Sequence, residues 1–231
     1  MSRNLILSGG IFHDFEATSR ALETLLVPLG IRSTIREDVE EALGELGEGA
    51  YDMLTVNALR WPMDGEKYAP WREQWALSLS EESRRAIDDF VRGGGAMLGL
   101  HAASICFGDW PDWRDLLGGA WRWDESYHPP PAPVSVRPTA AGAALGLQPF
   151  EVTDERYSDL DLREDIEILL VAEDEAGGEQ PLVWRQRVGA GRVACDLLGH
   201  DPDSLAVPAH AEALRGLVAW VLKRPASEAA A

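Results

Sequence analysis

The segment Ala96-Met-Leu-Gly-Leu-His-Ala-Ala103 is the most informative stretch of this 231-residue chain. Its uncharged apolar run up to Leu100 is typical of a strand that is buried on both faces. Small residues follow His101, so the segment resembles a nucleophile elbow, in which a sharp turn between strand and helix exposes one side chain. We predict that His101 holds the position where acyl-transfer enzymes carry Ser or Cys.

Strands and helices are expected to alternate on the N-terminal side of this segment. Short apolar runs predict strands at 4–10, 31–36 and 51–57. Apolar residues at helical spacing predict helices at 13–29, 39–46 and 80–92, the last with Ser80 as its N-cap. Strands separated by helices in this way indicate a parallel sheet covered on both faces.

The pattern on the C-terminal side is less regular. Prolines at 129–131 and 133 exclude a helix, and an edge strand is expected at 134–137. Further strands and a final helix are expected at 166–172, 180–187, 191–198 and 208–222. We predict one α/β domain over residues 1–224, followed by a disordered tail at 225–231.

The composition excludes several classes of protein. With 21 basic and 39 acidic residues, the net charge is 21 − 39 = −18, which argues against binding to nucleic acid or to anionic membranes. No apolar run approaches the ~20 residues that span a bilayer, and the first ten residues do not resemble a signal peptide. Two cysteines are too few for a disulfide framework. We therefore expect a cytoplasmic protein.

Polar residues cluster at the predicted ends of the strands. Ligands of open parallel sheets bind beyond the carboxyl ends of the strands, where His13, Asn57, His101 and His200 are expected. His128 lies in a proline-restricted loop that could fold over the same crevice. We predict that these side chains line one cavity, whereas His210, on the final helix, is expected to be an ordinary surface or packing residue.

These residue types suit proton transfer. Imidazoles titrate near neutral pH and can shuttle protons or bind a metal ion. Glu155, in Asp154-Glu-Arg-Tyr157, could orient an imidazole, act as a general base or complete a metal shell, although a solvated loop is the alternative. The sequence lacks the tight spacing of known metal motifs, so we predict no metal cofactor. A divalent transition metal such as Zn stays an option, with the ligands His13, His101, His128 and His200.

Nine tryptophans are many for this length. Seven of them gather in two segments that each follow a predicted strand end, at 61–75 and 110–123. Flat indole faces beside carboxylates and histidines suit stacking on the apolar face of a sugar ring, although some of the indoles must be core. We predict that Trp61, Trp123 and Tyr157 position a substrate.

Six motifs, in this order, resemble the trehalose-utilisation (ThuA-like) family over roughly residues 4–222. They are Gly9-Gly10 with His13-Asp14-Phe15, Gly99-Leu-His-Ala-Ala103, Tyr127-His128-Pro129, Asp154-Glu-Arg-Tyr157, Pro181-Leu-Val-Trp184 with Gly189-Ala-Gly-Arg192, and Leu198-Gly-His-Asp201. The resemblance implies a class I glutamine amidotransferase-like fold: a flavodoxin-like three-layer α/β sandwich with a mostly parallel sheet and helices on both faces. It also implies His in place of Cys at the elbow. Arg156 and the Pro129-Pro130-Pro131 run depart from the family pattern at the rim of the pocket.

The same resemblance implies a role in sugar catabolism, notably of trehalose and related disaccharides through 3-keto intermediates. We hypothesise an enzyme that hydrolyses or isomerises a keto-sugar, with His101, His200 and Glu155 as its acid–base groups and a small carbohydrate as its partner. A non-catalytic sugar-binding or regulatory protein is one alternative. A thiol amidotransferase is disfavoured because the elbow has no Cys, and Cys106 is expected inside the next helix. A homo-oligomer stays open.

Overall fold

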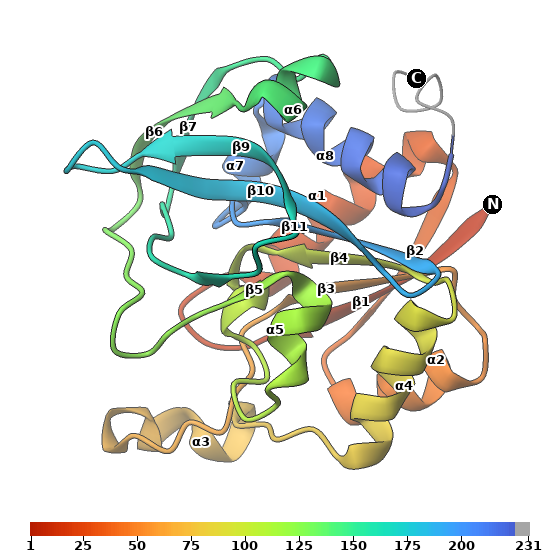
Figure 1. The fold of residues 1–231 in the computed structure, drawn as a ribbon. Helices are drawn as coiled ribbons and strands as arrows, with labels where there is room; N and C mark the ends of the chain where they lie inside the picture. Colours follow the sequence, from red (N-terminus) through yellow and green to blue (C-terminus); the bar gives the residue numbers. More distant parts are fainter. Residues whose placement is uncertain (225–231) are drawn as a thin grey trace.

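A nine-stranded sheet forms the middle layer of the protein (Figure 1). The computed structural model describes residues 1–224, so the predicted tail at 225–231 lies outside the described residues. In order across the sheet, the strands are β2 (Ile31–Arg36), β1 (Ser2–Gly9), β3 (Met53–Ala58), β4 (Ala96–Leu100), β11 (Gly191–Asp196), β10 (Glu179–Val188), β9 (Glu167–Glu173), β6 (Ala132–Pro138) and β7 (Phe150–Asp154).

Strand direction divides the sheet into two halves. The strands β2, β1, β3, β4 and β11 pair in parallel, which confirms the predicted parallel sheet and the flavodoxin-like α/β fold. From β11 onward the pairing is antiparallel, through β10, β9, β6 and β7. A separate short pair joins β5 (Gly119–Ala120) to β8 (Asp161–Leu162). The antiparallel half extends the sheet that the parallel half begins.

Helices cover both faces of the sheet, as Figure 1 shows. One face carries α1 (Phe15–Leu26), α6 (Ala140–Ala144), α7 (Pro202–Ala206) and α8 (Pro208–Val221), and the other carries α2 (Val39–Gly47), α4 (Glu81–Arg92) and α5 (Asp112–Leu117). Leu22 and Leu217 belong to the core on the first face, whereas Leu43 and Ile87 belong to the core on the second. The predicted three layers are therefore present.

Local signals set the ends of two predicted helices. The Asp14 carboxylate accepts a hydrogen bond from the Ala17 N–H at 2.9 Å and caps α1. After α1, a 3₁₀ turn at Val27–Leu29 ends at Gly30, whose φ of 65° is open to glycine at little cost. Ser80 caps α4 in the same way as Asp14, because its hydroxyl accepts from the Ser83 N–H at 3.1 Å.

One expectation requires correction. The strand predicted at 134–137 is not an edge strand, because β6 lies between β9 and β7. Pro133 is tolerated there since β6 pairs with β9 only from Val136 onward, so the missing N–H interrupts no ladder on that side. The actual edge, β7, was not predicted as a strand. The Trp-rich stretch after β3 also contains a 3₁₀ turn at Glu66–Tyr68 and the helix α3 (Ala69–Trp75).

A buried ion pair joins α8 to β11. His210 is fully buried, which excludes the surface position that was one of its two predicted roles. Its Nδ1 lies 2.8 Å from the Ser204 carbonyl oxygen, and its Nε2 lies 2.9 Å from the Asp196 carboxylate. Burial lowers the pKa of His210, but the Asp196 charge and hydrogen bond outweigh it and raise the pKa. Both ring nitrogens face acceptors, so the geometry suits an imidazolium.

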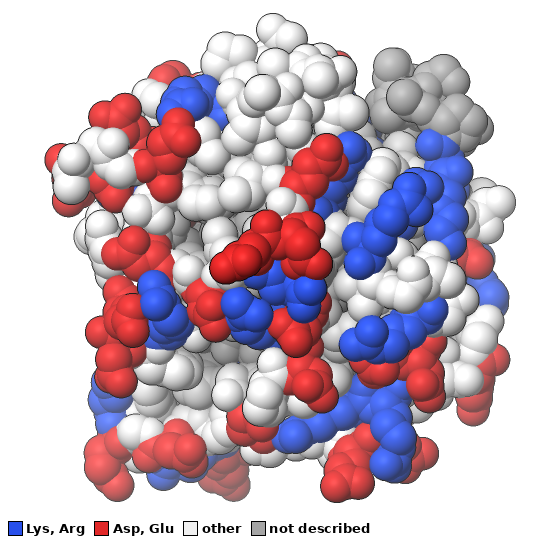
Figure 2. Space-filling view, in the orientation of Figure 1, with Lys and Arg blue, Asp and Glu red and all other residues white. Residues whose placement is uncertain are grey.

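Acidic and basic side chains are interspersed on the face of the molecule shown in Figure 2. Several of them pair, as Arg114 does with Asp161 at 2.8 Å and Arg163 with Asp115 at 3.1 Å. Among the described residues, no helix has both the length and the apolar character needed to cross a membrane.

Candidate active site

His101 stands at a strained turn between β4 and the 3₁₀ helix His101–Ile105. Its φ of 48° lies in the left-handed region, which costs a non-glycine residue about 1–2 kcal/mol. Gly99 permits the close packing behind the turn, because a Cβ there would lie 2.5 Å from Leu117 Cδ1. The elbow predicted from the sequence is thus present, although its side chain is buried, with 1 % exposed, rather than open to solvent.

A backbone carbonyl fixes the orientation of the His101 ring. The Nδ1 atom lies 2.8 Å from the Leu197 carbonyl oxygen, which can only accept, so we assign the hydrogen to Nδ1. The Nε2 atom then faces the interior of the site, where it lies 3.1 Å from His13 Nε2 and 3.5 Å from the Tyr157 hydroxyl. The ring is therefore positioned to act through Nε2.

Glu155 is the centre on which four histidines converge. Its Oε2 atom lies 3.4 Å from His200 Nδ1, 3.5 Å from His101 Nε2 and 3.6 Å from His13 Nε2. Its other oxygen, Oε1, lies 3.4 Å from His128 Nδ1. The structure thus brings together the five residues that the sequence placed around one cavity, and Glu155 is buried rather than part of a solvated loop.

The electrostatics of this cluster favour an ionised carboxylate. Burial raises the pKa of Glu155, but the neighbouring imidazoles of His101, His13 and His128 outweigh that effect and hold the pKa well below its usual range. Burial lowers the pKa of His101, but the nearby carboxylates of Glu155 and Asp154 more than reverse that effect and raise the pKa. The cluster therefore favours a negative charge on Glu155 and a positive charge next to it.

Asp154 positions two members of the cluster, although the sequence analysis did not select it as a site residue. Its fully buried carboxylate accepts from the backbone N–H groups of Glu155 at 2.8 Å, Gly199 at 2.7 Å and His200 at 3.4 Å. The Ser204 hydroxyl also donates to it. One side chain thus ties the end of β7 to the turn that follows β11. Its place next to Glu155 was the signal available in the sequence.

Aromatic rings close one side of the cluster. Tyr157 is buried and stacks on His128 with ring centroids 5.0 Å apart, while its centroid lies 4.9 Å from that of His101. Trp121 packs edge-on against Tyr157 at 5.4 Å and against His128 at 5.9 Å. Tyr157 was predicted here; Trp121 was noted only as one of the clustered tryptophans.

Of the three other predicted binding residues, Asn57 is closed to a ligand, and Trp61 and Trp123 pack against each other. Asn57 is 1 % exposed and donates both amide hydrogens to the Thr18 and Ser19 hydroxyls, so it fastens α1 to β3 and is closed to a ligand. The ring centroids of Trp61 and Trp123 lie 5.6 Å apart. Among residues 1–224, no aromatic contact joins either indole to a histidine of the cluster.

A hollow of about 430 Å³ opens beside His13. Phe12, which is 64 % exposed, and Trp75 line it together with Gly9 and Gly10. The two glycines allow the chain to pass close to its neighbours, since a Cβ on Gly9 would lie 2.8 Å from the Trp75 ring and one on Gly10 would lie 2.6 Å from the Leu59 carbonyl oxygen. Of the five residues of the cluster, only His13 lines this hollow.

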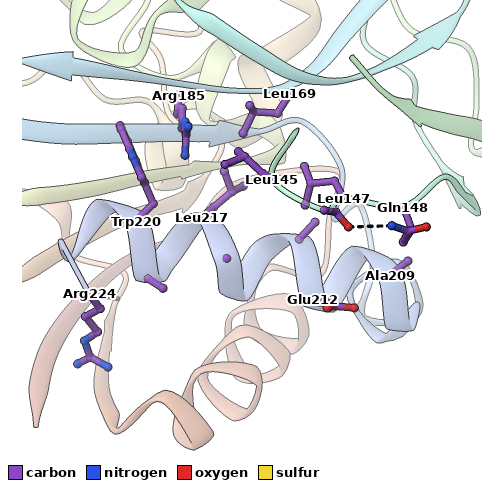
Figure 3. Close-up of a pocket in the computed structure, with 14 residues that line it drawn as sticks. Leu145, Leu147, Gln148, Leu169, Arg185, Ala209, Glu212, Leu217, Trp220 and Arg224 are labelled. Carbon is purple, nitrogen blue, oxygen red and sulfur yellow. Dashed lines mark hydrogen bonds between the residues drawn. The ribbon is translucent and has the colours of Figure 1, made fainter. Parts of the chain in front are cut away.

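A second groove, of about 250 Å³, is separate from the cluster. Figure 3 shows it between α8 and the chain around Leu145 and Leu147, with Leu169, Leu217 and Trp220 as apolar walls. None of the four histidines and no part of Glu155 lines it. We therefore place the candidate chemistry at the histidine cluster and not in this groove.

Cys106 is a buried thiol with no sign of activation. It follows the 3₁₀ helix rather than lying inside a helix, because the turn at His101–Ile105 ends one residue before it. Its Sγ donates to the Ala58 carbonyl oxygen at 3.0 Å, and burial raises its pKa to about 12. Burial likewise raises the pKa of Cys195. A nucleophilic thiolate needs the opposite shift.

We expect both cysteines to resist iodoacetamide in the folded protein, because each thiol is buried and protonated at neutral pH. Mass spectrometry after a short pulse should find neither thiol alkylated in buffer and both alkylated in concentrated urea. Rapid modification of Cys106 in the native protein would contradict this expectation and reopen the thiol amidotransferase hypothesis.

Comparisons with known proteins agree with this architecture. The sequence model of the family described as ThuA, trehalose utilisation, matches residues 49–221. A putative ThuA-like protein from Parabacteroides merdae ATCC 43184 is 18 % identical, with a TM-score of 0.74 over 96 % of this chain and 90 % of that chain. A similar protein from Bacteroides uniformis ATCC 8492 is 19 % identical, with a TM-score of 0.67 over 95 % and 91 %.

A third similar structure is a cytoplasmic protein from Salmonella typhimurium LT2. It is 14 % identical, with a TM-score of 0.61 over 96 % of this chain and 97 % of that chain. At such identities the structural likeness concerns the fold alone. No match is found among curated proteins.

Proposed function

Because the chain belongs to the ThuA (trehalose utilisation) family, we propose that it is an enzyme of sugar catabolism that hydrolyses or isomerises a 3-keto-disaccharide or a related keto-sugar. The single observation that supports catalysis is the convergence of four imidazoles on the buried, ionised carboxylate of Glu155. Such a cluster can both remove and supply protons within one site.

Keto-sugar chemistry needs those two abilities together. A ketone makes the hydrogen on the neighbouring carbon acidic, and a base that removes it leaves an enediolate whose charge lies on the carbonyl oxygen. Isomerisation returns a proton to the adjacent carbon. Hydrolysis instead breaks the glycosidic C–O bond next to that carbon, with a proton passing to the departing oxygen, and water then adds across the double bond. In each case one group accepts a proton and another donates one.

The cluster offers a group for each role. Glu155 is ionised, and its lowered pKa suits holding an imidazole in the required protonation state better than acting as the base itself. His101 is fixed by the Leu197 carbonyl and presents Nε2 to the site, next to the reacting atoms of a bound sugar. The side chains of His200 and His128 are 21 % and 34 % exposed, so they are the imidazoles that an entering sugar meets first.

Turnover of a keto-sugar tests this proposal. We expect the purified chain to convert 3-keto-trehalose, or another 3-keto-disaccharide, while leaving the unoxidised parent sugar unchanged, as followed by NMR of the products. His101→Asn should abolish turnover, and the control variant Cys106→Ser should retain it. Binding of the sugar without turnover, unaffected by His101→Asn, would instead support a sensor or regulatory protein and overturn the enzymatic proposal.

A further inference from the structure

Two imidazole nitrogens in the cluster face each other without a hydrogen to share. His13 Nδ1 lies 3.2 Å from the Ile11 carbonyl oxygen, as His101 Nδ1 lies 2.8 Å from that of Leu197. Because a carbonyl only accepts, each Nδ1 carries the hydrogen of its neutral ring, and each Nε2 then carries a lone pair. These two Nε2 atoms are 3.1 Å apart, so two lone pairs meet head-on.

Two more atoms that can bind a metal ion lie at the same place. Glu155 Oε2 and His200 Nδ1 are buried and make no hydrogen bond to any described residue. Buried polar atoms without a partner are costly and rare in folded proteins, and they often mark a position where an ion binds. All four atoms lie within 4.8 Å of one another. Four potential ligand atoms therefore surround one point, and a positive ion at that point would satisfy them.

We propose that His13 Nε2, His101 Nε2, His200 Nδ1 and Glu155 Oε2 bind one divalent first-row transition metal ion. Bonds of about 2.0–2.1 Å in a tetrahedral shell place neighbouring ligand atoms about 3.3 Å apart. Four of the six separations among these atoms are 3.1, 3.4, 3.5 and 3.6 Å, which bracket that value, and the other two are at most 4.8 Å. Three imidazoles with one carboxylate suit Zn²⁺, Fe²⁺, Ni²⁺ or Mn²⁺ better than Ca²⁺ or Mg²⁺.

The groups behind the ligands support this assignment. Backbone carbonyls hold the rings of His13 and His101, and Asp154 holds the backbone of both Glu155 and His200. Such outer contacts are typical of metal sites, in which they set the tautomer and direction of each ligand. The separate elements that carry the ligands are therefore fixed in position before an ion arrives.

His128 is outside the ligand set, although the sequence analysis grouped it with the other three histidines. Its Nδ1 faces the second carboxylate oxygen, Oε1, at 3.4 Å and the Pro129 carbonyl oxygen at 3.2 Å. It is also the most exposed of the four histidine side chains, at 34 %. The fourth ligand is thus Glu155 and not His128, which gives the proposal a matched control.

The catalytic meaning of this ion rests on the proposed function, since a Lewis acid beside a ketone would polarise the carbonyl and stabilise an enediolate. Its binding can be measured without any sugar. The full chain, stripped with chelator and dialysed, would be titrated with Zn²⁺ by calorimetry and with Co²⁺ by visible absorption. We expect one ion per chain, with the Co²⁺ bands of nitrogen and oxygen ligands.

Matched variants separate ligands from neighbours. His13→Ala and Glu155→Gln should each weaken Zn²⁺ binding at least about 100-fold, whereas His128→Ala, which removes only an outer contact of Glu155, should weaken it by no more than about 10-fold. Far-UV circular dichroism of the metal-free variants checks that each one is folded, and the rise in Tm on adding Zn²⁺ gives a second readout. We expect that rise in the wild type and in His128→Ala only.

Two results would overturn the metal site. The first is that folded His13→Ala binds one Zn²⁺ ion per chain as tightly as the wild type does. The second is that His128→Ala loses as much affinity for Zn²⁺ as His13→Ala does. Because no sugar is present, failure here leaves the proposed reaction standing. Equally, failure of the keto-sugar assay would leave the metal site standing.

Discussion

Glu155→Gln is expected to lower kcat on a keto-sugar by about 10²–10⁴-fold, the range that a positioned acid–base group contributes. The amide keeps the size of the side chain but removes its negative charge. Three imidazole nitrogens lie 3.4 to 3.6 Å from the Oε2 atom that carries this charge. Steady-state kinetics of the purified variant measures the effect, and the main change should be in kcat rather than in KM.

Glu151→Gln is the matched control for that substitution. Glu151 lies on the same strand, β7, but its side chain is exposed and belongs to no part of the cluster. Its kinetics should equal those of the wild type. If both variants retained full turnover, Glu155 would have no role in the reaction, and the assignment of its carboxylate to acid–base chemistry would be wrong.

Asp196→Ala is expected to lower the free energy of unfolding by about 3–5 kcal/mol, the usual effect of removing one partner from a buried ion pair. The substitution leaves the fully buried His210 without its carboxylate partner at 2.9 Å, and the Leu198 N–H loses an acceptor at 3.0 Å. Urea denaturation followed by circular dichroism measures the loss. Glu81→Ala, which removes an exposed pair with Arg85, should cost far less.

The pair of His210 and Asp196 also predicts how the free energy of unfolding of the wild type, relative to that of Asp196→Ala, depends on pH. The pKa of His210 is raised above its ordinary value of 6.5, mainly because the Asp196 charge and hydrogen bond outweigh the opposing effect of burial. Its contribution to stability is therefore complete below about pH 6.5 and is lost as the pH rises through the raised pKa. The difference in free energy of unfolding between the wild type and Asp196→Ala should therefore decrease as the pH rises. A constant gap from pH 6 to pH 9 would contradict the imidazolium assignment.

The parallel half of the sheet was predictable because its signals are local. Uncharged apolar runs mark its strands, and Asp14, Gly30 and Ser80 mark the helix ends next to them. His13, His101 and His200 follow such strands, so the rule for ligands at carboxyl ends places them together. Glu155 and His128 lie in polar segments, and the family resemblance supported their place in the same site.

The remainder depends on contacts between residues distant in sequence. Whether a strand lies at an edge is decided by its neighbours, so the proline-containing β6 was misplaced and β7 was missed. Asn57 stands at a strand end like the histidines, but Thr18 and Ser19 on α1 satisfy its amide. Likewise, no local pattern distinguishes Trp121, which packs against Tyr157, from the tryptophans of the core.

The division of the sheet has a consequence for folding. His13, His101 and His200 follow strands of the parallel half, whereas Glu155 and Tyr157 follow the outermost antiparallel strand. The cluster forms only when segments that are far apart in the sequence, from both halves of the sheet, come together. Contacts between such distant segments are slow to form. After dilution from denaturant, we therefore expect the proposed turnover to recover later than the helical signal, because the cluster exists only once both halves of the sheet have joined.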